Sequence, residues 1–166
     1  TFEIPLHDQK IGVWCAISAR HIVGPIFFEG ILNSERYVDE ILNPFFTNLA
    51  EGEQYHGHFM QDGATPHTAR HSMQALRAVY EDKIISSGVW PPRFPDLNPC
   101  DYYLWGNLKA KVYRNNPHDL ETLKENIRNV IFNINRDELQ EVSEDLFRRI
   151  QACLREGGRH FEHHRG

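Results

Sequence analysis

Two stretches decide how the chain folds: residues 61–69, with the sequence QDGATPHTA, and residues 90–105, with the sequence WPPRFPDLNPCDYYLW. An apolar-leaning run, His58 to Gln61, leads into the first stretch and indicates a strand. The small residues and the proline that follow indicate a loop, after which Thr68 to Tyr80 has the spacing of an amphipathic helix. The order strand, loop, helix places Asp62 where α/β folds display functional groups.

The second stretch predicts a loop followed by a helix. Three prolines exclude regular structure over Trp90–Asn98, and Pro99 favours a helix start, so that Cys100–Tyr113 is predicted to be helical with Asp101 in its first turn. Asp96 and Asp101 could each be a metal ligand or a helix cap. The helix dipole favours a carboxylate in a first turn, so structure alone would also explain Asp101.

The remaining pattern predicts a mixed sheet flanked by helices. Ile11–Ser18 and Ile22–Phe28 have the composition of a β-hairpin, in which Pro25 places the second strand at a sheet edge or a bulge. Apolar spacing predicts a helix over Ser34–Leu49, capped by Ser34 and kinked or divided at Pro44. A short strand and two C-terminal helices complete the set: Lys83–Ser86, Leu120–Ile134 and Asp137–Arg155.

Length and composition fit one globular domain. The chain has 166 residues, of which 40% are hydrophobic and 25% charged, and it has neither an apolar run long enough to span a membrane nor a secretory signal at Thr1–Lys10. Three cysteines, far apart in sequence, indicate neither disulfides nor a thiolate zinc site, which favours a reducing compartment. The net charge of −5 argues against tight autonomous DNA binding but is compatible with a carboxylate-based nuclease centre.

Other chemical readings of single residues stay open. Asp62 is as well explained by an Asx-turn or a helix cap as by catalysis. The histidines at 56, 58, 160, 163 and 164 suggest a zinc site, but a solvated C-terminal tail explains the terminal cluster better.

Taken together, the two stretches resemble mariner-type DDE/D transposases in residue kind, order and spacing, and the resemblance extends from the strand at Val13–Ser18 to the segment Gly157–Glu162. It implies an RNase-H-like α/β fold and a catalytic domain in which two divalent ions, Mg²⁺ or Mn²⁺, held by three carboxylates, cut and join DNA strands. By this resemblance Asp62 is the second carboxylate and Asp101 the third, both catalytic metal ligands, while Asp96 is a loop residue. The 38 residues between Asp62 and Asp101 (101 − 62 − 1) exceed the spacing typical of mariner proteins.

The N-terminal part of the family pattern has no match in this sequence. The resemblance places the first carboxylate on a central strand upstream of Val13, and Asp8 does not occupy that position. We therefore expect residues 1–166 to be a partial catalytic domain that lacks the first strand, is inactive alone, and acts in the nucleus on transposon-end DNA through an N-terminal module that is absent here. Whether activity survives, and whether a homodimer forms, stays open.

Two further expectations follow. The chain could instead be a decayed or repurposed transposon remnant that serves only as a protein-interaction or nucleic-acid-binding module. A missing central strand would also leave inner sheet edges unpaired, unless the two remaining edges pair directly, so we expect edge-paired oligomers and weak hydrogen-exchange protection at Val13, Cys15 and Ile17.

Overall fold

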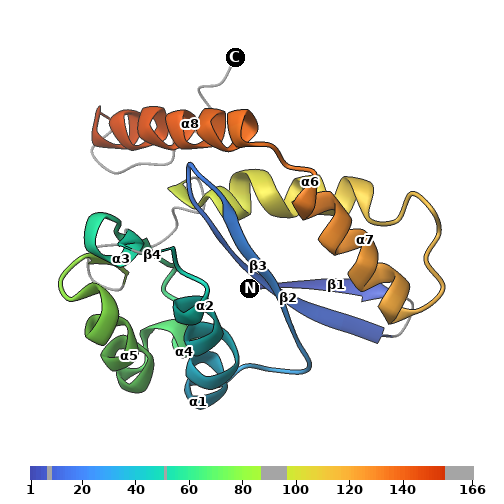
Figure 1. Ribbon diagram of the computed structural model, residues 1–166, viewed down its shortest axis with the longest axis horizontal. Helices are drawn as coiled ribbons and strands as arrows, with labels where there is room; N and C mark the ends of the chain where they lie inside the picture. Colours follow the sequence, from blue (N-terminus) through green and yellow to red (C-terminus); the bar gives the residue numbers. More distant parts are fainter. Residues whose placement is uncertain (7–8, 51, 87–96, 156–166) are drawn as a thin grey trace. The chain divides into compact units, whose positions relative to one another are not determined.

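The computed structural model describes residues 1–6, 9–50, 52–86 and 97–155, which belong to two compact units (Figure 1). The first unit combines the N-terminal segment Thr1–Gly30 with the C-terminal segment Pro95–Gly166. The second unit is the intervening segment Ile31–Phe94.

The first unit contains a three-stranded antiparallel sheet in the order β1-β2-β3. Its strands are β1 (Phe2–Leu6), β2 (Gln9–Ile17) and β3 (Ile22–Phe28). The predicted hairpin is thus confirmed as β2 and β3. Ser18 and His21 close the connection, because the Ser18 amide donates to the His21 carbonyl at 3.0 Å.

The predicted irregularity at Pro25 is a bulge. Trp14 pairs with Ile26 and Ala16 with Val23, so Gly24 and Pro25 together lie opposite a single residue of β2. Gly24 has φ +116°, and a Cβ at this position would lie 2.9 Å from the Trp14 carbonyl oxygen. The bulge therefore requires glycine, both for its backbone conformation and for the close approach of β2.

Strand β1 was not expected from the sequence. It pairs with β2 on the side away from β3, with Ile4 opposite Ile11 and Phe2 opposite Val13. The expectation that this edge of β2 is unpaired is therefore wrong up to Val13, which removes the reason to expect weak protection there. The expectations for Cys15 and Ile17 stay untested.

Besides α8 (Arg136–Arg155), the unit contains helical segments that form a core with this sheet. They are η3 (Cys100–Leu104), a π-helical turn, followed by α6 (Trp105–Lys111) and α7 (Leu120–Phe132). Their buried residues pack against those of β1 and β2, and the main members are Ile4, Ile11, Val13, Leu104, Leu108, Leu123 and Ile127. Trp105 is 5% exposed and stacks on Phe2 with ring centroids 5.2 Å apart, while Trp14 is also 5% exposed.

Two tyrosines of η3 form hydrogen bonds with helix α8. The Tyr102 hydroxyl donates to the Val142 carbonyl at 2.9 Å, and the Tyr103 hydroxyl donates to Glu138. The Arg149 guanidinium lies 3.9 Å from the Tyr102 ring centroid and donates to Asp145 at 2.8 Å. Because Arg149 is buried, its charge needs both of these contacts.

The second unit consists of helices and a two-stranded parallel sheet. The predicted helix at Ser34–Leu49 is a continuous helical run of α1 (Ser34–Arg36), π-helical η1 (Tyr37–Leu42) and α2 (Asn43–Thr47). Asn33 rather than Ser34 caps it, by accepting from the Arg36 amide at 2.8 Å. The other elements are α3 (Glu53–His56), β4 (Phe59–Met60), α4 (Thr65–Thr68), α5 (Arg70–Tyr80) and β5 (Ile84–Ile85).

The pairing of β4 with β5 confirms the two short strands predicted at His58–Gln61 and Lys83–Ser86. Phe59 lies opposite Ile84 and Met60 opposite Ile85, in parallel register. An aromatic cluster of Phe45, Phe59 and Tyr80 supports β4, with ring centroids 5.5 to 5.7 Å apart. In the described part of the chain, no helix is long and apolar enough to cross a membrane.

Candidate metal-binding carboxylates

Asp62 follows β4 at the carboxyl end of the parallel pair, at the position predicted from the sequence. Its Oδ1 accepts from the Ala64 amide at 3.0 Å, which is an Asx-turn. Asp62 does not cap α4, because Ala64 holds the N-cap position and no side chain bonds there. The local turn explains part of the preference for Asp, but it occupies only one of the two carboxylate oxygens.

His67 is the second partner of Asp62. Its Nδ1 lies 2.6 Å from the same Oδ1, and the His67 side chain is 7% exposed against 45% for Asp62. This contact requires a proton on Nδ1, so a neutral His67 would leave Nε2 without one. The arrangement turns Asp62 toward a buried imidazole while much of its carboxylate stays open to solvent.

The buried amide of Gln61 holds this loop in shape. Its Oε1 accepts from the Tyr37 hydroxyl at 2.8 Å, and its Nε2 donates to the His67 carbonyl at 2.9 Å and to Ser86 Oγ at 3.1 Å. Tyr37 also packs on the His67 ring, with centroids 4.6 Å apart. Asp62 is therefore positioned by a hydrogen-bonded network from η1, the loop and the residue after β5.

The electrostatics of the loop keep Asp62 ionised. The hydrogen bond from His67 lowers the pKa of Asp62 from 3.8 to about 2, opposed by partial burial and assisted by the Ala64 amide. At neutral pH the carboxylate carries its full charge and requires no deprotonation to bind a cation.

Asp101 lies in the first turn of η3, as predicted. Pro99 precedes the helix with helical dihedral angles, and the Asp101 amide donates to the Asn98 carbonyl at 2.9 Å. The residue is exposed, whereas the neighbouring Leu104 and Trp105 anchor the helix in the core. The sequence therefore directs the carboxylate to the surface and the apolar side chains inward.

The two carboxylates belong to different units, Asp62 to the second and Asp101 to the first. The prediction that they meet at one metal cluster thus stays a prediction. Among the described residues, no group of three or more His, Cys, Asp and Glu side chains is arranged to hold a metal ion. Asp62 and Asp101 fit a divalent cation by the type of their oxygen donors, but they do not by themselves provide a complete ligand set.

Other candidates are answered only in part. Asp8, Asp96 and the histidines at 160, 163 and 164 lie outside the described residues. Cys15 and Cys100 are not in a disulfide, and burial raises the pKa of Cys15 well above its ordinary value.

His67, Gln61 and Tyr37 were not predicted from the sequence as the residues that position Asp62. His67 stands in the quoted stretch, but its role depends on a turn of α4 that brings residue 67 back to residue 62. Tyr37 is 24 positions from Gln61, so no local pattern pairs them.

Comparison with known proteins adds one relative in sequence and several in structure. No protein-family model matches the chain. The Transposable element Tc3 transposase of Caenorhabditis elegans is 27% identical over 148 residues, which cover 88% of this chain and 44% of that protein. The chain thus spans less than half the length of this curated relative.

Solved structures of the Mos1 transposase share the fold. The Mos1 catalytic domain with raltegravir and Mn matches 97% of this chain and 82% of its own, with a TM-score of 0.81 and 18% identity. The corresponding structure with Mg gives a TM-score of 0.76 at 19% identity, covering 92% and 77%. The Mos1 mariner paired end complex with Mn also gives 0.76 at 19% identity, covering 96% of this chain and 47% of that one.

These matches agree with the two sequence motifs and with the fold described above. The chain is thus related in sequence to a Tc3 transposase and has the RNase-H-like α/β fold of the mariner-type transposase catalytic domain.

Proposed function

We propose that the chain is part of a DNA transposase catalytic domain in which Asp62 and Asp101 bind a divalent cation, Mg²⁺ or Mn²⁺. The observation that carries the proposal is the ionised, rigidly positioned Asp62 at the end of β4, within a fold shared with Mos1 structures that contain Mg and Mn. Paired divalent ions would activate the attacking oxygen and stabilise the leaving oxygen of a phosphodiester.

The chain's own residues supply the position and charge of these ligands. His67 and the Ala64 amide both bind Oδ1 of Asp62, and neither of these two hydrogen bonds involves Oδ2. That second oxygen is the one we assign to the metal. Asp101 would contribute a second carboxylate, as the exposed residue of a helical turn that Pro99 precedes.

We further propose that DNA is the substrate, that the nucleus is the compartment, and that this chain alone does not cut DNA. The described residues provide two candidate carboxylates where the two-metal chemistry of the resembled family uses three. The net charge of −5 supports the idea that transposon-end recognition depends on another module.

Titration with Mn²⁺ at neutral pH, followed by calorimetry, tests the metal site. We expect weak binding that Asp62→Ala and Asp101→Ala each reduce. Asp82→Ala and Asp137→Ala are matched controls, because both acids are exposed and Asp137 also lies in a helical first turn. Equal binding by all five proteins would reject the site.

The alternative is a remnant that performs no chemistry. The same titration separates the two functions, since a protein-interaction module requires no Mn²⁺ affinity and no sensitivity to Asp62.

A further inference from the structure

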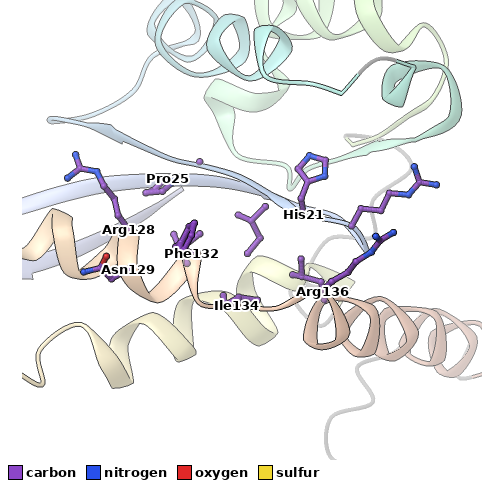
Figure 2. A pocket seen from close by; sticks show the side chains of 12 residues that line it. His21, Pro25, Arg128, Asn129, Phe132, Ile134 and Arg136 are labelled. Atoms are coloured by element: carbon purple, nitrogen blue, oxygen red, sulfur yellow. The ribbon is translucent and has the colours of Figure 1, made fainter.

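A second candidate site lies in the first unit, away from both carboxylates in sequence. A pocket of about 580 Å³ opens between the β2–β3 connection, α7 and the start of α8 (Figure 2). Its charged lining is basic, with Arg20 from the connection, Arg128 from α7 and Arg136 from α8, and His21 lies next to Arg20 in the sequence. None of the twelve lining residues is acidic, in a chain whose net charge is −5.

Apart from Asn129, the rest of the lining is apolar or aromatic. Ile22, Ile131 and Leu139 contribute aliphatic surface, and Phe132 contributes a ring that is 88% exposed. Figure 2 shows Arg128 and Arg136 on opposite sides of this apolar surface, with Phe132 between them. A large aromatic side chain that remains this exposed is not explained by packing, and it offers a stacking surface.

The walls of the pocket are held by contacts outside it. The two tyrosines of η3 fasten α8, and Asn135 fixes its first turn by accepting from the Glu138 amide at 2.8 Å. Arg128 is oriented by Glu125 at 3.2 Å and by the Phe27 ring, whose centroid is 5.1 Å away. The pocket therefore exists before any ligand arrives.

Arg136 has no evident stabilising role in its own helix. It is the first residue of α8, where the helix dipole disfavours a positive charge and favours an anion. An anion in the pocket would meet the guanidinium at the start of α8, whose first turn also carries Asp137 and Glu138.

We propose that this pocket binds an unpaired stretch of a DNA strand, with backbone phosphates on Arg20, Arg128 and Arg136 and one base stacked on Phe132. The proposal rests on the proposed function for the identity of the nucleic acid. Separated cations around an aromatic surface match the alternation of phosphates and bases along a single strand. In a duplex the bases are stacked on one another, so Phe132 could not reach a base face.

Fluorescence anisotropy with a labelled oligodeoxythymidine tests the proposal, using the full chain in EDTA. We expect weak, salt-dependent binding, and each of Arg128→Ala and Arg136→Ala should reduce the slope of log K against log salt by about 0.7. Phe132→Ala should weaken binding by about tenfold, as expected for one stacked base, whereas Phe132→Tyr should retain it.

Matched controls come from the same unit. Arg148 and Phe147 on α8 are exposed and lie outside the pocket, so Arg148→Ala and Phe147→Ala should leave binding unchanged. Equal losses in the controls, equal affinity for a duplex, or an absence of binding would each overturn the proposal. Displacement of the strand by inorganic phosphate at equal concentration would also overturn it, by indicating a simple anion site.

The carboxylate site does not enter this measurement, because EDTA removes divalent cations. If the unmodified chain binds the oligonucleotide but not Mn²⁺, the metal site alone is rejected. If it binds Mn²⁺ but not the oligonucleotide, the pocket alone is rejected.

Discussion

The structural role of Asp62 is compatible with the metal-binding role proposed for it. Its Oδ1 closes the Asx-turn and accepts the His67 contact at 2.6 Å, and these bonds fix the direction of the other oxygen. A carboxylate held by second-sphere hydrogen bonds loses less freedom when it binds a metal. The structural and the catalytic explanations of Asp62 are therefore not exclusive.

The lowered pKa of Asp62 predicts a pH dependence of folding stability. A carboxyl whose folded pKa is about 2, against an ordinary 3.8, stabilises the fold above pH 4 and loses this contribution as the pH falls from about 4 to about 2. In EDTA, urea unfolding at pH 7 and pH 3 should show a larger loss of stability for the unmodified chain than for Asp62→Asn. The effect should be small, because the side chain is 45% exposed. Identical losses would contradict the assigned pKa.

Gln61 gives a second prediction at this scale. Gln61→Met keeps the size of the side chain but removes the amide oxygen that accepts from the buried Tyr37 hydroxyl and the amide nitrogen that donates to the His67 carbonyl. We expect a loss of about 1–3 kcal/mol in the free energy of unfolding. Adding Tyr37→Phe should cost less in the Gln61→Met background than in the unmodified chain. Additive losses in this double-mutant cycle would show that the two side chains are not coupled.

At the scale of elements, the β2–β3 hairpin depends on its bulge. Gly24 combines a positive φ with a close approach to β2, since a Cβ there would lie 2.9 Å from the Trp14 carbonyl oxygen. A Cβ at Gly106 in α6 would instead meet open space. A side chain at position 24 would therefore clash with β2, whereas a side chain at position 106 would have room.

Alanine substitution should separate them. Gly24→Ala should destabilise the chain by about 1–3 kcal/mol through backbone strain and contact with β2. Gly106→Ala should stabilise it by about 0.5–1 kcal/mol, because alanine favours a helix interior. Thermal unfolding of both variants measures the two shifts, and a neutral Gly24→Ala would mean that the bulge rearranges freely.

The elements also show what the sequence could and could not predict. The spacing of apolar residues and the positions of turn residues predicted the bounds of five elements closely. These elements are β2, β3, α5, α7 and α8. Strand β1 was missed since its five residues include a proline and only two fully buried positions, Ile4 and Leu6, whose partners lie in β2. The π-helical turns at Tyr37–Leu42 and Cys100–Leu104 have no periodic signature of their own.

For the molecule as a whole, the sequence motifs predicted the positions of Asp62 and Asp101 in the fold. They did not predict the residues that hold Asp62 in place. Each carboxylate follows local signals, a strand end in one case and a proline-started helix in the other. The network of Tyr37, Gln61 and Ser86 depends on contacts across 24 and 25 positions, which local patterns cannot supply. The same holds for the basic pocket, whose members come from separate segments of the chain.

Under the proposed function, the 166-residue chain should not nick DNA by itself. Because the proposal gives it two carboxylates where the resembled family uses three, incubation with supercoiled plasmid and Mn²⁺ should give no more nicked product than Asp62→Ala. Agarose electrophoresis measures the conversion. Nicking that disappears only in Asp62→Ala would show that a further residue completes the site.

The burial of Trp14 and Trp105 in the first unit gives the protein an intrinsic optical reporter. Both indoles are 5% exposed, and Trp105 stacks on Phe2, so their emission should shift to longer wavelength when water enters the first unit. The third tryptophan, Trp90, lies outside the described residues. In a Trp90→Phe background, indole emission would therefore follow the first unit alone, while far-ultraviolet dichroism would follow the helices of both. Coincident transitions would indicate one cooperative molecule, and separated transitions would give each unit its own stability.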